Sequence, residues 1–241
     1  MNIVFMGTPE FSVPTLQQLH KSIHNIQLVV TQPDRPKGRG RESVPSPIKL
    51  FALKEGIPVF QPEKCSTPEV ENTLRKYDTD VFVVVAFGQI LNKNLLSIPR
   101  NFCINLHSSL LPKYRGAAPI NWAIINGETE TGITTMKMDS GLDTGDILLT
   151  HKVSIAPSDD AKSLHDTLAL EGPTLMLDTL KKLESGTLKS IRQNSDHSTY
   201  APKLKKKDGL IDWNQSAFKI HNRVRGLLPW PGTHSFLGSR R

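Results

Sequence analysis

The sequence predicts an α/β fold in which a doubly wound, mostly parallel, Rossmann-like sheet is followed by a linker and a short second segment. The chain opens with an apolar strand at residues 3–6, helical spacing over residues 11–20 and a second strand at residues 28–30, which is a βαβ unit. Residues 81–86 form a continuous apolar run, which is typical of a central strand covered on both faces. Near residue 190 the pattern changes to Ser, Asn, Asp and Lys, which indicates a linker.

The composition is typical of a soluble globular protein. The chain has 241 residues, of which 37% are hydrophobic, and a mean hydropathy of −0.30. No apolar run approaches the length of a membrane span, and the first residues lack the basic region and cleavage site of a signal peptide. Cys65 and Cys103 lie in dissimilar contexts, which favours free thiols in a reducing compartment. We therefore expect a cytoplasmic protein with no membrane partner.

The charge favours a nucleic-acid partner without proving one. The net charge is +7 and the sequence pI is about 9.4. Residues 200–225 alone hold seven Lys or Arg against two Asp. The excess positive charge is therefore expected near the linker.

The remaining elements alternate down the chain. We expect strands at residues 58–60, 131–138 and 147–155, and helices at residues 48–55, 68–77, 118–126 and 163–183. The turn after the first strand, Gly7-Thr8-Pro9, lacks the second and third glycines of a dinucleotide-binding fingerprint. A nicotinamide cofactor is therefore not expected.

Residues 32–47 are predicted to be a loop, because they contain four Pro, two Gly and a cluster of charges. A loop of this length is unusual in a βα connection and is often functional. The basic side chains suit contacts to phosphate, although a solvated surface loop would have the same composition. The basic residues concerned are Arg35, Lys37, Arg39 and Arg41.

A candidate catalytic pair lies where a strand ends, before Ser-Ser-Leu-Leu-Pro. Asn105 and His107 alternate along the strand, so their side chains share a face. Ligands of open α/β sheets bind at the carboxyl ends of strands. A His can move a proton near neutral pH, and an Asn amide can donate to an oxyanion, which together suit acyl chemistry.

The longer stretch from Asn105 to Ile120, Asn-x-His-x-Ser-Leu-Leu-Pro followed by Tyr-Arg-Gly-Ala-Ala-Pro-Ile, resembles the signature of the folate-dependent formyltransferases. The match runs from Met1 to about Trp230 and is closest to the branch that acts on tRNA. The resemblance implies transfer of a formyl group from 10-formyltetrahydrofolate to the α-amino group of methionine on initiator tRNA, as a step of translation initiation.

The same resemblance assigns site residues. Asp143, in Leu-Asp-Thr-Gly, would complete a catalytic triad with Asn105 and His107. No metal is required, and the acidic loop at residues 139–146 does not fit a calcium-binding pattern. The residues implied in folate binding are Phe87, Gly88, Gln89, Ile90, Leu91, Ser109, Leu110, Leu111, Pro112, Asp139, Gly141 and Leu142.

The resemblance also divides the chain. Residues 1–189 would be the catalytic domain, 190–207 a linker, and 208–241 an incomplete C-terminal β-barrel domain, since family members continue past this point with further strands. An incomplete barrel predicts weaker tRNA binding than in a longer relative. The tRNA contacts expected are Arg35, Lys37, Arg39 and Arg41 of the basic loop, and Lys203, Lys205, Lys206 and Lys207 of the linker. We expect a monomer.

Three other functions remain open at this point. The same triad serves formyltransferases that act on glycinamide ribonucleotide or on a nucleotide-linked amino sugar. A tRNA-binding module without catalysis would share the basic segments, but the intact triad argues against it. The basic loop favours the tRNA branch over both of the other enzymes. The segment after Tyr200 favours it only over the glycinamide ribonucleotide enzyme, because the amino-sugar enzymes share Tyr-Arg-Gly and an extended C-terminus.

Overall fold

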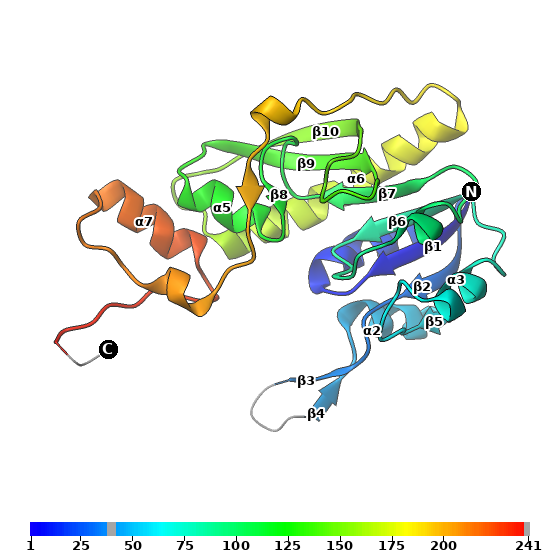
Figure 1. The fold of residues 1–241 in the computed structure, drawn as a ribbon, viewed down its shortest axis with the longest axis horizontal. Coiled ribbons are helices and arrows are strands. Elements are labelled where there is room, and N and C mark those ends of the chain that lie inside the picture. The colour runs from blue at the N-terminus through cyan, green and yellow to red at the C-terminus, as the bar shows by residue number, and fades with distance from the viewer. Residues whose placement is uncertain (38–41, 239–241) are drawn as a thin grey trace.

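The computed structural model describes residues 1–37 and 42–238. Its centre is a seven-stranded sheet in the order β10-β9-β7-β6-β1-β2-β5 (Figure 1). The strands from β7 to β5 pair in parallel, whereas β9 pairs antiparallel with both β7 and the edge strand β10. The bounds are β1 Asn2–Gly7, β2 Asn25–Val30, β5 Val59–Phe60, β6 Val81–Val85, β7 Cys103–His107, β9 Glu130–Lys137 and β10 Ile147–Ser154. The predicted doubly wound sheet is confirmed.

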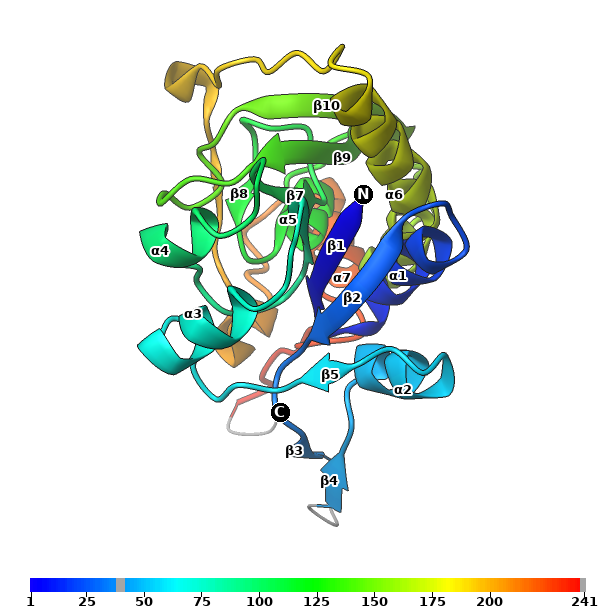
Figure 2. The same cartoon turned by 90° about the vertical axis from the view of Figure 1, so that its right-hand side faces the viewer.

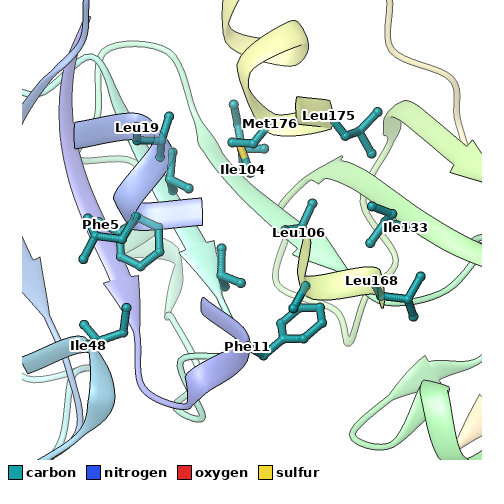
Figure 3. Close-up of a cluster of buried hydrophobic side chains, with 14 of the residues drawn as sticks. Phe5, Phe11, Leu19, Ile48, Ile104, Leu106, Ile133, Leu168, Leu175 and Met176 are labelled. Atoms are coloured by element: carbon teal, nitrogen blue, oxygen red, sulfur yellow. The ribbon is translucent and has the colours of Figure 1, made fainter. Parts of the chain in front are cut away.

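Helices cover both faces of the sheet, and alternate residues of the strands serve each face. In β1, Ile3 and Phe5 enter one core cluster while Val4 and Met6 enter the other. The first cluster is covered by α1, α2, α5 and α6, and Figure 3 shows Phe5, Leu19 and Ile104 among its side chains. The second is covered by α3 and α4. The bounds are α1 Val13–His20, α2 Pro47–Lys54, α3 Pro68–Leu74, α4 Lys93–Leu96, α5 Pro119–Ile125 and α6 Ala161–Glu184.

Local sequence explains where these helices begin. Ser46 and Thr67 accept hydrogen bonds from the backbone N–H three residues on, which caps α2 and α3. Each of these helices has Pro in its first turn, where the missing N–H costs nothing. Asp160 and Ser163 form a reciprocal capping box at the start of α6. The helices predicted at residues 48–55, 68–77, 118–126 and 163–183 are therefore confirmed with small shifts at their ends.

The segment at residues 32–47 differs from the predicted loop. Its described part contains the strands β3 Arg35–Lys37 and β4 Glu42–Val44, which pair antiparallel. This ribbon projects from the body beyond β5 (Figures 1 and 2). Arg39 and Arg41 lie outside the described residues. Strands of three residues are too short to give a recognisable alternation, so composition alone predicted a loop.

Residues 190–201 run back across the part of the chain that holds the seven-stranded sheet. Ile191 pairs with Ile147 at the start of β10, and β11 Tyr200–Ala201 pairs in parallel with β8 Arg115–Gly116. Figure 1 shows this orange segment beside β8. The structure also contains three short 3-10 helices, at Glu10–Ser12, Ser195–His197 and Lys206–Gly209.

After residue 208 the described chain contains α7 Ala217–Gly226 and an isolated bridge from Leu210 to His234, and its described residues form no sheet. α7 lies against α5 (Figure 1). The Asn121 side chain donates to the Gly226 carbonyl at 2.8 Å, and Arg225 donates to the Ala156 and Asp159 carbonyls. No helix in residues 1–37 and 42–238 is long and apolar enough to cross a membrane.

Candidate active site

A cleft of about 740 Å³ opens at the carboxyl ends of β6 and β7. Its walls are the turn after β6, the end of β7, the start of α5 and the loop after β9. Phe11, His165 and Tyr200 complete it from other parts of the chain. A cavity of this size lined mainly by apolar residues and a few polar ones is typical of a small-molecule site.

Asn105, His107 and Asp143 all line this cleft, as the sequence predicts. Asn105 and His107 come from β7, and Asp143 from the loop between β9 and β10. The His107 side chain is 6% exposed and that of Asp143 is 16% exposed. The three residue types are therefore brought together in a largely desolvated place.

The His107 ring is fixed through one nitrogen. Its Nε2 lies 2.9 Å from the Tyr114 carbonyl oxygen, which can only accept, so Nε2 carries a proton. Its Nδ1 lies 3.7 Å from Asp143 Oδ2, which is an ion-pair distance when the ring is charged. The ring nitrogen that can exchange a proton in the cleft is therefore Nδ1, and Asp143 faces it.

The Tyr114 carbonyl is held by contacts around that residue. Tyr114 has φ of 60°, and its N–H donates to Thr199 Oγ1 at 2.8 Å. Burial raises the pKa of Tyr114 to about 12, so its hydroxyl stays protonated and donates to Glu128 at 2.8 Å. A non-glycine residue in this region costs about 1–3 kcal/mol and persists where the surroundings enforce it.

Asp143 is also held in the left-handed region, with φ of 54°. Its Oδ2 accepts the Gly116 N–H at 2.8 Å. Two residues later Gly145 approaches β9 so closely that a Cβ would lie 1.7 Å from the Lys137 carbonyl oxygen. The Asp-Thr-Gly spacing therefore has a steric reason, because only glycine lets the loop return to β9 at this point.

The Asn105 side chain has no hydrogen-bond partner within residues 1–37 and 42–238, although it lines the cleft. Its backbone is fixed between Val84 of β6 and Met136 of β9. The amide is therefore positioned by rigid strands and available to a carbonyl oxygen in the cleft.

The turn at residues 87–91 lines the cleft as the resemblance implies. Gln89 fixes it by accepting the Cys65 N–H at 2.6 Å and donating to the Pro62 carbonyl at 3.1 Å. Thr8 donates to the Phe87 carbonyl at 2.9 Å. Ile90 remains 83% exposed. The turn therefore has a rigid base and one apolar side chain projecting into solvent.

On the opposite wall, Asp139, Gly141 and Leu142 also line the cleft. Asp139 Oδ1 accepts from the Gly141 N–H at 3.0 Å and from Thr144 Oγ1 at 2.7 Å. Leu142 is 54% exposed. This carboxylate therefore shapes its own loop.

Four further residues implied in folate binding, Ser109, Leu110, Leu111 and Pro112, directly follow Ser108 of the cleft wall, and their role stays a prediction. Ser109 is fully buried and donates to the Lys113 carbonyl at 2.6 Å, and Leu111 is 6% exposed. Leu110 and Pro112 line a separate cavity of about 360 Å³. These residues shape the loop that carries Tyr114.

The residues predicted to contact tRNA differ in their exposure and in their ion pairs. Arg35 is exposed and pairs with Glu63 at 2.6 Å, and Lys37 lies in β3. The side chains of Lys203, Lys205, Lys206 and Lys207 are exposed, and in the described part of the chain none has an ion pair. These lysines follow Tyr200, which lines the cleft. Within the described residues no cluster of His, Cys, Asp and Glu could hold a metal ion.

Sequence reasoning missed the contacts that orient the triad. Tyr114 belongs to the Tyr-Arg-Gly motif, but nothing in that motif shows that its carbonyl meets His107. Thr199 and Gln193 reach Tyr114 and Asp143 only through the path of residues 190–201. The two aromatic positions Phe11 and Tyr200 in the cleft wall were likewise not predicted as site residues.

Comparison with known proteins identifies relatives of the whole chain. Residues 1–180 match the formyl transferase family, and residues 203–241 match the C-terminal domain of formyl transferases. The chain is 56% identical to a methionyl-tRNA formyltransferase of Geobacter metallireducens, over all of this chain and 77% of that protein. It is 52% identical to one of Caldanaerobacter subterraneus, over 98% of this chain and 77% of that protein.

Solved structures with the same fold are more distant in sequence. A 4-N formyltransferase from Francisella tularensis matches with a TM-score of 0.77 at 17% identity, over 100% of this chain and 94% of that one. An N-formyltransferase from Helicobacter canadensis, in complex with folinic acid and dTDP-3-aminofucose, matches with a TM-score of 0.72 at 22% identity, over 93% and 79%.

Proposed function

The chain belongs to the formyl transferase family, and from this membership we infer that it transfers a formyl group to the α-amino group of methionine on initiator tRNA. Relatives that are 53–56% identical to this chain over its whole length are named for that reaction. The formyl donor is a formyl-tetrahydrofolate, and we propose that it is the 10-formyl isomer.

The observation that carries the proposed chemistry is the placement of Asn105, His107 and Asp143 in one cleft, with the Asn105 amide unpaired in the described structure and His107 Nδ1 facing Asp143. A formyl carbonyl bound here would place its oxygen against the Asn105 amide. That amide would stabilise the oxyanion formed when the amine attacks.

We propose that His107 and Asp143 move the proton that the reaction must transfer. The amine nitrogen forms a bond to the formyl carbon, and the bond from that carbon to the folate nitrogen breaks. The amine loses one proton and the folate nitrogen gains one. His107 exchanges this proton through Nδ1, because Nε2 is occupied by the Tyr114 carbonyl, and Asp143 stabilises the charged ring.

Two walls of the cleft would enclose the folate. The turn at residues 87–91 forms one wall, and Asp139, Gly141 and Leu142 form the other. The exposed Ile90 and Leu142 supply apolar surface for a ring system. Ser109, Leu110, Leu111 and Pro112 follow Ser108 of the cleft wall, and the family resemblance keeps them as proposed folate-binding residues.

We propose that tRNA approaches along Lys203, Lys205, Lys206 and Lys207. These side chains are exposed, and the chain reaches them directly after Tyr200 in the cleft wall. Lysines attract phosphates at little geometric cost, which positions the acceptor end without reading its sequence. The ribbon with Arg35 and Lys37 would add a second contact.

The deciding experiment is a formylation assay of this chain with methionyl-initiator tRNA, run beside an amino-sugar nucleotide and with 10-formyltetrahydrofolate as donor. We expect formylmethionyl-tRNA and no formyl sugar. The sugar enzyme is the second candidate because solved sugar formyltransferases share the fold. Formylation of the sugar alone would replace the proposal with that candidate.

A further inference from the structure

We propose that Gln193, in the segment that crosses the catalytic domain, is a positioning residue for the reaction, acting on the loop that carries Asp143. The proposal rests on the catalytic role proposed for Asp143. It assigns a function to the bracing segment, which we define as residues 191–201.

Gln193 is buried, with 7% of its surface exposed, and its side-chain amide donates to two backbone carbonyls of the loop that carries Asp143. Its Nε2 donates to the Asp143 carbonyl at 2.9 Å and to the Gly145 carbonyl at 2.7 Å. One amide group therefore spans Thr144 and fixes the backbone on both sides of it. A buried amide with both protons used is a specific brace, since any shift of the loop leaves a buried donor unpaired.

The orientation of this amide is set by Arg115. The Arg115 Nε and Nη2 both donate to Gln193 Oε1, at 3.0 and 2.8 Å. Two donors on one oxygen require the Nε2 side of the amide to face the loop carbonyls. Gly116, the next residue, donates its N–H to Asp143 Oδ2. The backbone and the carboxylate of Asp143 are therefore both held by contacts that pass through residues 115 and 116.

Asp143 has φ of 54°, a left-handed conformation that Asp tolerates but adopts less often than the β or right-handed regions, so contacts around the loop help to hold it there. A relaxed loop would turn the carboxylate away from His107 Nδ1, which is 3.7 Å away. The bracing segment is itself anchored by reciprocal backbone hydrogen bonds between Ile191 and Ile147 and by the pairing of β11 with β8. Gln193 thus lies between two fixed points.

Two variants of Gln193 separate its donor role from its packing. Gln193→Met keeps the volume and loses all four hydrogen bonds. Gln193→Glu keeps an acceptor for Arg115 but points a carboxylate oxygen at the two loop carbonyls. Asn194→Ala is the matched control, because Asn194 is exposed and its side chain accepts only the Asp196 N–H. All variants are made in the full chain, and their unfolding temperatures are recorded.

We expect Gln193→Met and Gln193→Glu to lower kcat about 10- to 100-fold with little change in KM for the folate, since small misplacements of a catalytic group cost this much. Asn194→Ala should be unchanged. Gln193→Glu with normal kcat would overturn the proposal, because it would show that packing and the Arg115 contact suffice.

A double-mutant cycle with Asp143→Ala completes the test. If Gln193 acts through Asp143, adding Gln193→Met to Asp143→Ala should lower kcat no further. Full additivity of the two losses would contradict the positioning role. If Asp143→Ala alone left kcat normal, the proposed function of the triad would fail instead, so the two failures are distinguishable.

Discussion

At the scale of single residues, the proposed reaction depends most on His107, whose ring is fixed at Nε2 and faces Asp143 through Nδ1. We expect His107→Ala to reduce kcat by about 10²–10⁴-fold, the usual effect of losing a general acid–base. Folate binding should persist, because both loops that would enclose it are unaffected. The measurement is formyl transfer together with thermal stabilisation by a folate analogue.

The control for that variant is His221→Ala, which removes an exposed ring on α7, outside the cleft. It should leave transfer at the wild-type rate. Near-normal transfer by His107→Ala would show that the proton moves by another route.

Asp143→Asn separates the charge of this residue from its conformation. Asn tolerates the left-handed region and can accept the Gly116 N–H, so the unfolding temperature should stay close to that of the wild type. The negative charge is lost, so kcat should fall while folate binding remains. A variant with unchanged kcat would show that Asp143 serves only as a loop residue.

His24 gives the protein an acid-sensitive contact far from the cleft. Burial, followed by the charge of the Met1 amino group, lowers the pKa of His24 below its usual 6.5. The folded state therefore binds this proton less readily than the unfolded chain, so stability is full above pH 6.5 and falls as pH drops through the lowered pKa. We expect His24→Gln to flatten the decline in unfolding temperature across that window.

The two thiols are expected to be inert. Burial raises the pKa of Cys65 to about 11 and also raises the pKa of Cys103. The thiolate is the reactive form, so native protein at mildly alkaline pH should resist iodoacetamide that modifies both residues after unfolding. Mass spectrometry of the two samples checks this, and rapid native labelling would contradict the buried placement.

Much of the site could be predicted at this scale, and the remainder could not, for a physical reason. Asn105, His107 and Asp143 belong to motifs whose spacing survives in the linear sequence. Gln193 and Thr199 act through contacts to residues about 50 and 85 positions away. Such contacts depend on the path of the chain in space, which no local period encodes.

At the scale of elements, α7 packs against α5 through a close approach at Gly226. A Cβ there would lie 2.7 Å from Ile125 Cγ1 in α5. We expect Gly226→Ala to destabilise the fold by about 1–3 kcal/mol, the usual cost of overpacking. The unfolding temperature should fall by about 2–4 °C per kcal/mol. Lys219→Ala, on an exposed position of α7, should cause no such change.

The helices were well predicted because their caps and first-turn prolines are local signals. The ribbon β3–β4 and the four-residue α4 were not, since three or four residues are too few for the strand or helix period to repeat. The pairing of β11 with β8 was also not predicted, because a two-residue parallel strand is defined only by its partner.

At the scale of the whole molecule, the basic balance of +7 should appear as salt-dependent tRNA binding. Replacing Lys205, Lys206 and Lys207 by Ala should reduce the magnitude of the slope of log affinity against log salt by about 0.7–0.9 for each phosphate that is no longer neutralised. Replacing Lys181 and Lys182, which are exposed near the C-terminal end of α6, is the control. If the variant and the wild type had equal slopes, Lys205, Lys206 and Lys207 would not contact the phosphates of tRNA.

The path of residues 191–201 has a consequence for anyone who builds chimaeras within this family. A junction placed in the polar stretch near residue 190 would take Gln193, Thr199 and Tyr200 from the incoming protein, and with them the supports of Asp143 and Tyr114. A recombinant that exchanges the part proposed to contact tRNA should therefore be joined after Ala201, where the pairing with β8 is complete. The change in composition suggests a junction near residue 190, but the segment that supports the proposed catalytic residues ends only with β11.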